Sequence, residues 1–163
     1  MKKFDPFEYQ NVFYEYDLKV SDEEIKQVYI LTKDSMAKSD QKTTYYSLNI
    51  LNFPLLKNLR KQVIDILDEY KLNLSNNWSQ LYNKYSKHGV HIHENSIYSG
   101  IIYLQPKEAS PTIFYDKSYK EYFYKFKKNK MLLFPSHIPH AVDSLQKDEE
   151  RLIISFNTGK NNV

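Results

Sequence analysis

The sequence predicts a mainly β domain with helices in its first half (α+β class), whose strands form a sandwich or barrel. From Trp78 onward, short apolar runs follow one another with no long helical stretch between them, which is typical of such folds. Before Trp78, two segments carry apolar residues at helical spacing. A chain of 163 residues is long enough for one domain with a substantial core, so a single domain over residues 1–163 is expected.

The first half is predicted to alternate between strand and helix. Residues 11–18 (NVFYEYDL) favour a strand, and Ser21 with Glu24 forms a capping-box pattern that predicts the start of a helix. Residues 43–50 (TTYYSLNI) favour a β-rich segment, and residues 53–72 favour a second helix. The two apolar stripes are Ile25, Val28, Tyr29, Thr32 and Met36, then Leu55, Leu59, Val63, Ile66, Leu67 and Tyr70. Both stripes are expected to face the core.

Short β-type runs dominate the second half, and each predicts a strand. They are WSQLYNKY (78–85), SIYSGIIYL (96–104), PTIFYD (111–116), KMLLFPS (130–136) and RLIISFN (151–157). Residues 116–130 (DKSYKEYFYKFKKNK) alternate between basic and aromatic side chains. Such a segment suits a platform for a nucleic-acid base or an anionic polymer, or a solvated β-hairpin with a lysine-rich tip. The hairpin is the more common case and is the interpretation preferred here.

Composition excludes several classes of function. Cysteine is absent, which removes disulfides, thiolate nucleophiles and cysteine-based metal sites. The net charge of +3 is mild and gives little reason to expect a nucleic-acid partner. No window is apolar and long enough to span a bilayer, so a soluble, cytoplasmic protein is expected. The chain also lacks a glycine-rich phosphate loop, a G-x-S-x-G elbow and an H-E-x-x-H helix.

All five histidines fall into two short clusters. His88, His91 and His93 lie within KHGVHIHENS, and His137 and His140 lie within FPSHIPH. In an extended strand, alternate side chains share a face, so the imidazoles of His91 and His93 are expected to point the same way. Two histidines on one strand and a third from a distant strand form a facial set of ligands with open positions opposite, as redox-active Fe(II) requires. His140 is the candidate for the third ligand.

Arg151 heads the last predicted strand, where Ser155 shares its face. An inward arginine needs an anion, because an unpaired buried charge is costly. The guanidinium fork fits a carboxylate, and a serine hydroxyl can add one hydrogen bond. The alternative is a surface salt bridge with the acidic run at 148–150. Beside the histidines, a clamp for a metal-bound organic acid is the preferred interpretation.

Residues 78–157 resemble a known family through four ordered motifs. These are H-x-H-x-N-S from His91, S-G-x-x-Y-L from Ser99, L-F-P-S-x-x-x-H-x-V from Leu133 and R-x-x-x-S-F-N from Arg151. In this order they resemble the prokaryotic and phage group of 2-oxoglutarate- and Fe(II)-dependent oxygenases, which is related to prolyl 4-hydroxylases. The resemblance implies a double-stranded β-helix, a jelly-roll or cupin-like barrel, formed by residues 78–157 and supported by a helix-bearing segment in residues 1–77.

The same resemblance implies the roles of individual residues. His91, His93 and His140 would bind Fe(II), and Arg151 would hold the far carboxylate of 2-oxoglutarate. Tyr103, Ser155 and Asn95 match positions near that co-substrate. The enzyme would use O2 to decarboxylate 2-oxoglutarate to succinate and to hydroxylate a substrate. The substrate is left open between a small molecule, a protein side chain and a nucleic-acid base, and a homodimer and a phage origin are also left open.

His93 departs from the family pattern, because the wider superfamily has Asp or Glu at this position. The site would then carry one more positive charge. Glu94 is an alternative ligand, but strand alternation places it on the opposite face unless a bulge intervenes. A shifted pair of His93 with Asn95 would use a poorer ligand. His88 and His137 are interpreted as supporting or surface groups.

Two other functions remain open from the sequence. One is a cupin-like barrel with a three-histidine metal site and isomerase or lyase activity. The other is a non-catalytic jelly-roll structural protein in which the histidines are incidental. Arg151 separates the first from an oxygenase, since it should bind 2-oxoglutarate only in the oxygenase.

Overall fold

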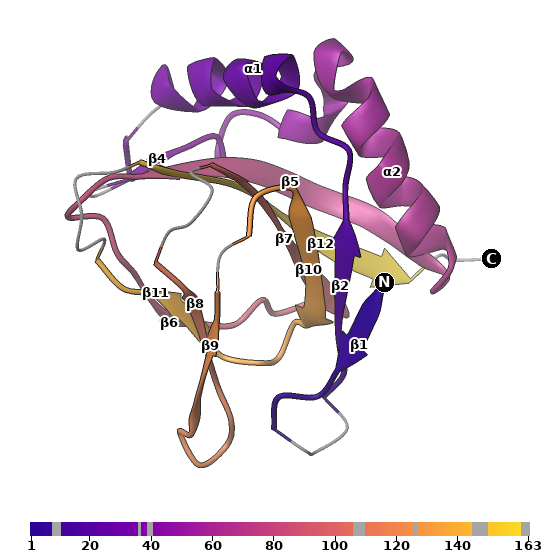
Figure 1. Cartoon of the computed structure of the whole chain (residues 1–163), viewed down its shortest axis with the longest axis vertical. Coiled ribbons are helices and arrows are strands. Elements are labelled where there is room, and N and C mark those ends of the chain that lie inside the picture. Colours follow the sequence, from indigo (N-terminus) through magenta and orange to yellow (C-terminus); the bar gives the residue numbers. More distant parts are fainter. Residues whose placement is uncertain are drawn as a thin grey trace.

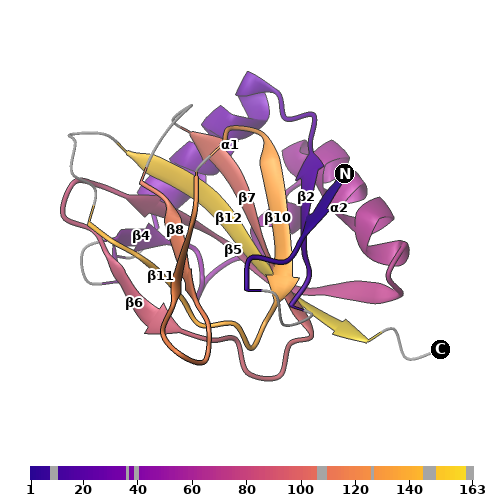
Figure 2. The ribbon, with the colours of Figure 1, turned by 60° about the horizontal axis from the view of Figure 1, so that its bottom comes forward.

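Two antiparallel sheets face each other, and two helices cover the outer face of the larger sheet (Figure 1). This is the architecture of a computed structural model that describes residues 1–7, 11–35, 37–38, 41–105, 110–125, 127–144 and 150–160. Figure 2 shows β6, β11 and β8 of the small sheet lying across from β5, β12, β7 and β10 of the large one. The predicted β-rich class with a jelly-roll arrangement is confirmed, and the two sheets do not close into a continuous barrel.

The large sheet has eight strands and the small sheet has four. In spatial order, the large sheet contains β1 (Lys2–Phe4), β2 (Phe13–Asp17), β10 (Lys130–Pro135), β7 (Tyr98–Gln105), β12 (Arg151–Lys160), β5 (Leu72–Tyr82), β4 (Gln41–Thr43) and β3 (Ala37–Lys38). The small sheet contains β6 (His88–His91), β11 (His140–Val142), β8 (Thr112–Tyr115) and β9 (Glu121–Tyr124). All five strands predicted in the second half are present, although β5 begins six residues before the predicted start at Trp78.

The helices are α1 (Asp22–Lys33) and α2 (Lys57–Asp68), with 3₁₀ turns η1 (Ile50–Asn52) and η2 (Pro54–Leu56) before α2. The capping box at Ser21 is confirmed, because its hydroxyl accepts from the Glu24 amide and the Glu24 carboxylate accepts from the Ser21 amide. Neither helix in the described part of the chain has the length and apolar character needed to cross a membrane.

Two details of the predicted helices differ from the structure. Pro54 starts a 3₁₀ turn instead of the helix itself, so Leu55 is 54% exposed and does not belong to the buried stripe. Tyr70 lies beyond the end of α2 at Asp68. Met36, predicted at the end of the first stripe, lies outside the described residues.

The predicted β-rich segment at 43–50 is wrong for most of its length. Strand β4 ends at Thr43, because the amides of Ser47 and Leu48 both donate to the Thr44 carbonyl and fold the chain into a turn. The local preference of threonine and tyrosine for strands is therefore overridden by this turn. As a consequence, Tyr45 and Tyr46 are exposed at one end of the sheet.

Each face of the large sheet buries a separate hydrophobic cluster. The outer face packs against α1 and α2 through residues such as Val28, Leu59 and Ile154. The inner face meets the small sheet through Tyr82, Tyr103, Phe114, Phe134 and neighbouring apolar residues. The space between the two sheets therefore has a largely aromatic lining, and the polar groups within it stand out.

Candidate metal centre and co-substrate site

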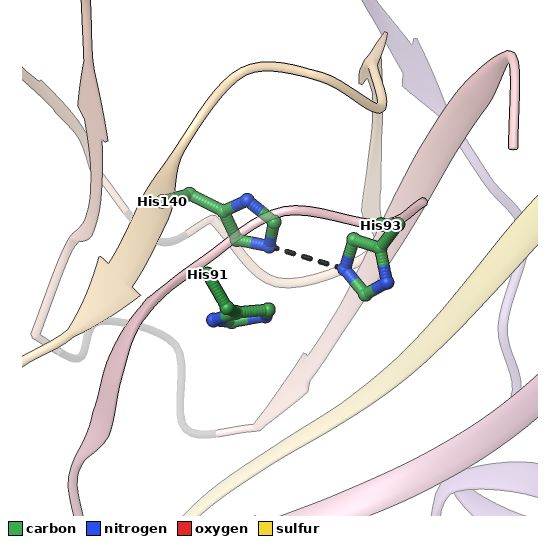
Figure 3. Close-up of side chains that lie close together, drawn as sticks. All are labelled: His91, His93 and His140. Atoms are coloured by element: carbon green, nitrogen blue, oxygen red, sulfur yellow. Dashed lines mark hydrogen bonds between the residues drawn. The ribbon is translucent and has the colours of Figure 1, made fainter. Parts of the chain in front are cut away.

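His91, His93 and His140 converge at one end of the space between the sheets (Figure 3). His91 ends β6 and is paired directly with His140, the first residue of β11. Strand β6 ends at His91, and the amide of His93 donates to the Ser136 carbonyl, which holds His93 beside the other two. One ligand atom from each imidazole lies within 4.8 Å of the others. The three histidines expected to bind metal are thus brought together.

The orientation of the rings suits a metal ion. The Nδ1 atoms of His91 and His140 lie 2.8 Å and 3.1 Å from the carbonyls of Gly89 and Ile138. A carbonyl can only accept, so each Nδ1 carries the proton and each Nε2 presents its lone pair. The Nε2 atoms of His93 and His140 are 3.3 Å apart. Nitrogen ligands about 2.1 Å from a metal, at angles of about 90–109°, are about 3.0–3.4 Å apart, so this spacing fits a shared ion.

The electrostatics keep the imidazoles of His93 and His140 neutral, which is the form that binds metal. Burial, followed by the proximity of His91, lowers the pKa of His93 to about 4. Burial also lowers the pKa of His140 well below its usual range, and His91 and His93 add to this effect. Three neutral nitrogen donors are a set that divalent transition metals accept readily. The residues present therefore fit a metal such as Fe(II).

Arg151 is fully buried, as expected for a clamp residue. Its Nη2 donates to the Thr112 hydroxyl over 2.8 Å, and its guanidinium lies 5.4 Å and 5.8 Å from the ring centres of Tyr82 and Tyr103. The side chains of Thr112, Tyr82 and Tyr103 are neutral at pH 7, and burial raises the pKa of Tyr103 to about 12. Glu150 is exposed and accepts from the Tyr29 hydroxyl, while positions 148 and 149 lie outside the described residues. A guanidinium in such surroundings is suited to binding an anion.

The register of the small sheet relates His140 to the hydrogen-bond partner of Arg151. His140 is paired with Phe114, whereas the partner of Arg151, Thr112, lies two residues further along β8. Two residues of a strand span about 7 Å. A five-carbon dicarboxylate can bridge this separation, with one end at a metal ion and the other at Arg151.

Ser155 and Tyr103 lie in the buried space, whereas Asn95 does not. The Ser155 hydroxyl donates to the Gln80 side-chain oxygen over 3.0 Å, and the Tyr103 hydroxyl is 2.9 Å from that of Thr112. Asn95 is exposed in the turn after His93, with φ 64°, a left-handed conformation that asparagine tolerates better than most residues. The structure gives it a role in the turn and does not bring it to Arg151.

The remaining candidates lie at the edge of the cluster. Glu94 is exposed, as strand alternation predicts, while His93 joins the other imidazoles. The ring of His88 stacks on that of His91 with centres 3.9 Å apart, so His88 supports a ligand. His137 is exposed and its Nε2 lies 3.2 Å from the Asn11 side-chain oxygen.

Three polar residues of the site were missed in the sequence, namely Gln80, Tyr82 and Thr112. Gln80 and Tyr82 alternate with Trp78 along β5, and this period of two places all three on one face. The sequence shows this alternation. It does not show which strands face β5, so it could not reveal that this face is the inner one. Thr112 offered no local signal.

A pocket of about 280 Å³ opens beside the histidines. It is lined by Thr43, Tyr45, Tyr46, Trp78, Gln80, His88, His91, Ile92 and His93. None of these described lining residues is Asp, Glu, Lys or Arg.

The basic segment at 116–130 forms the hairpin of β8 and β9 and the approach to β10. Several of its lysines are engaged in ion pairs: Lys127 and Lys130 lie 3.5 Å and 3.3 Å from the Glu15 carboxylate, and Lys128 lies 3.4 Å from Asp22. These contacts favour the hairpin interpretation over a nucleic-acid platform, since paired lysines attract phosphates less.

Solved structures of oxygenases share this architecture. A prolyl hydroxylase from Trichoplax adhaerens, solved with a peptide of hypoxia inducible factor, superposes with a TM-score of 0.73 at 14% identity, over 93% of this chain and 84% of that one. A viral collagen prolyl hydroxylase from Paramecium bursaria Chlorella virus-1, solved with 2-oxoglutarate, gives 0.68 at 13% identity over 91% and 95%. A 2-oxoglutarate–Fe(II) oxygenase family protein from Burkholderia pseudomallei gives 0.69 at 10% identity over 92% and 85%.

The relationship is visible in the fold and not in the overall sequence. No protein-family model matches the sequence, and a search of curated proteins finds no match. The chain therefore has the fold of the 2-oxoglutarate- and Fe(II)-dependent oxygenases, the group that includes prolyl hydroxylases.

Proposed function

We propose that this chain is an Fe(II)- and 2-oxoglutarate-dependent oxygenase that hydroxylates its substrate. One observation carries the proposal: three imidazoles meet beside the inner face of the sheets, and the buried Arg151 binds Thr112, two residues along β8 from the partner of His140. That arrangement matches a metal-chelating dicarboxylate. The oxygenase fold supports the same conclusion.

His91, His93 and His140 would hold the metal, and Arg151 with Thr112 would hold the far carboxylate of 2-oxoglutarate. When bound, the metal and 2-oxoglutarate supply the oxidising chemistry, in which O2 is consumed, 2-oxoglutarate becomes succinate and carbon dioxide, and the substrate gains a hydroxyl group. The protein binds and orients these groups and excludes water from them. Phe114 and Phe134 pack against the His140 ring and keep that side of the site dry.

The ligand set makes the site more positive than one with a carboxylate. Three neutral imidazoles leave the metal charge unreduced, and Arg151 adds another positive charge nearby. The dianionic co-substrate is therefore favoured electrostatically, and a cationic substrate is disfavoured. Ser155 and Gln80, which are hydrogen-bonded to each other on the inner face, would be further contacts for the co-substrate.

The test is the visible charge-transfer band that Fe(II) and chelated 2-oxoglutarate produce together. Metal-free protein would receive Fe(II) and 2-oxoglutarate without oxygen, beside His140→Ala, Arg151→Ala and the control His137→Ala, which changes an exposed histidine. We expect the band in the unmodified protein and in the control, its loss in His140→Ala and its weakening in Arg151→Ala. Succinate formation on admission of oxygen would then establish turnover.

A three-histidine metal barrel with isomerase or lyase activity is the second candidate, because the ligand set contains no carboxylate. Tight metal binding without the charge-transfer band would replace the oxygenase proposal with this one. Failure of the protein to retain any metal would instead favour a non-catalytic structural protein.

A further inference from the structure

A continuous chain of aromatic rings runs from the candidate metal centre to the surface. The Trp78 ring lies 5.8 Å from the ring of His93, the Tyr45 ring lies 4.9 Å from Trp78, and the Tyr46 ring lies 5.0 Å from Tyr45. Tyr45 stands nearly perpendicular to both neighbours, at 89° to Trp78 and 86° to Tyr46, the edge-to-face geometry of rings in contact. The two steps through Tyr45 are thus edge-to-face contacts, and Trp78 is a neighbour of His93.

Exposure rises along this chain. Trp78 is 5% exposed, Tyr45 48% and Tyr46 69%. Packing explains a buried tryptophan, but it does not explain two adjacent tyrosines held largely in water, since their apolar surface gains little there. Tryptophan and tyrosine are also the side chains that lose one electron most readily. On the other side of the cluster, the rings against His140 belong to Phe114 and Phe134, which resist such oxidation.

We infer that Trp78, Tyr45 and Tyr46 form an electron-transfer path that carries oxidising equivalents from the metal centre to the surface. The inference rests on the proposed function, because the oxygenase reaction supplies the oxidant. When no substrate occupies the site, an oxidant formed there attacks the protein itself unless it is reduced. A path of this kind protects the histidines that bind the metal.

The electrons balance as follows. Trp78 gives one electron to the oxidant formed from O2 and 2-oxoglutarate, and is left one electron short. Tyr45 restores Trp78 with one electron and releases its phenolic proton to water, which its exposure permits. Tyr46 gives one electron to Tyr45, which takes a proton back from water, and Tyr46 loses its own proton to water and becomes a neutral tyrosyl radical. A soluble thiol returns one hydrogen atom to Tyr46 and becomes a thiyl radical. After two such passes the two thiyl radicals combine into a disulfide, and the oxidant has taken up two electrons and two protons, so that its oxygen atom leaves as water.

The first test needs neither metal nor co-substrate. Trp78 is the only tryptophan, so azide radicals generated by pulse radiolysis in metal-free protein produce one indole radical. We expect its absorbance to decay with matching growth of the tyrosyl signal, at a rate independent of protein concentration. Tyr45→Phe keeps the ring but removes the oxidisable phenol, and should slow this step by more than an order of magnitude. Tyr85→Phe, which alters a 74% exposed tyrosine in the turn after β5, should not. Equal rates in all three proteins would overturn the inference.

The second test uses protein loaded with Fe(II), 2-oxoglutarate and oxygen but no substrate. Succinate is measured together with covalent oxidation of Trp78 and the three histidines, by peptide mass spectrometry. Per succinate formed, Tyr45→Phe should accumulate several times more oxidation than the unmodified protein or Tyr85→Phe. Succinate with equal oxidation in all proteins would overturn the path. Absence of succinate would overturn the proposed function instead, and the radiolysis result would still decide whether the path conducts.

Discussion

The Nε2 atoms of His93 and His140 lie 3.3 Å apart although 47 residues separate the two histidines in the chain. The pairing of His140 with His91 across β11 and β6 creates this proximity. Because the Nδ1 of His140 is engaged with the Ile138 carbonyl, its Nε2 is available to a partner. In the metal-free protein that partner is His93; a metal ion would occupy the same position between the two nitrogens.

Metal binding should quench the fluorescence of the protein's single tryptophan. Trp78 lies 5.8 Å from His93, well within the range at which a paramagnetic ion deactivates an excited indole. We expect Fe(II) or Ni(II), added without oxygen, to quench the emission with saturation. Loss of a residue that only supports a metal ligand lowers metal affinity by about 10–100-fold, so His140→Ala should lower the apparent metal affinity by more than that. His137→Ala should titrate like the unmodified protein, and identical curves for both variants would contradict the three-histidine site.

Local spacing in the sequence was enough to predict part of the geometry of this cluster. His91 and His93 are two residues apart, so their convergence followed from strand alternation alone, and Glu94 was correctly placed outside. His140 was a candidate because it lies in the second histidine cluster, but its pairing with His91 could not be read from the sequence. Thr112 could not be found, because its contact with Arg151 depends on the facing of two sheets.

The fold shows the same division between local and long-range information. The capping box at Ser21 was read correctly because both of its bonds lie within one turn of helix. Residues 43–50 were misassigned, since the amides that donate to Thr44 impose a turn that side-chain preference does not reveal. Because the turn was not predicted, the exposure of Tyr45 and Tyr46 beside the site was not predicted either.

Replacement of Arg151 by methionine should separate stability from co-substrate binding. Replacing a buried ionic group with an apolar one of similar volume is often neutral or stabilising, so we expect metal-free Arg151→Met to unfold at the same or a higher denaturant concentration. Its affinity for 2-oxoglutarate should fall by about 2–5 kcal/mol, because a buried charge pair is lost. Denaturant unfolding and calorimetric titration of 2-oxoglutarate measure the two effects.

Arg60→Met, on the exposed face of α2, is the control, and should change neither quantity. Arg151→Lys keeps the charge but loses the planar fork of the guanidinium. Its affinity for 2-oxoglutarate should lie between those of Arg151→Met and the unmodified protein. A large loss of stability in Arg151→Met, with 2-oxoglutarate affinity unchanged, would show that the arginine is structural.

Position 100 requires glycine, because the ring of Phe156 occupies the space that a side chain would need. Gly100 is paired with Phe156 in the centre of the large sheet, and a Cβ at this position would overlap that ring. We expect Gly100→Ala to lower the free energy of unfolding by about 1–3 kcal/mol, as overpacking of a core does. Phe156→Leu should recover part of the loss in the double variant. Gly89→Ala, where a Cβ meets nothing within 4 Å, should stay within about 0.5 kcal/mol of the unmodified protein.

Glu15 should make stability depend on pH. It is 6% exposed on β2, accepts from the Tyr124 hydroxyl over 2.8 Å, and lies near the ammonium groups of Lys130 and Lys127. Burial alone would raise the pKa of Glu15, but the Tyr124 hydrogen bond and the two lysines outweigh it and hold the pKa below its ordinary value of 4.5. A carboxyl with a lowered pKa in the folded state contributes stability above its unfolded pKa and loses it as the pH falls through the folded value.

Glu15→Gln should therefore be less stable at pH 7 by about 1–3 kcal/mol, because the Tyr124 hydroxyl loses a charged acceptor and the lysines lose their counter-charge. As the pH falls through the lowered pKa of Glu15, the wild-type carboxyl takes up a proton, and the two proteins should converge. Denaturant unfolding from pH 7 to pH 3 measures the difference, with Glu121→Gln, at an exposed position of β9, as the control. If the difference stayed constant over this range, shape and neutral hydrogen bonding, and not charge, would account for the role of Glu15.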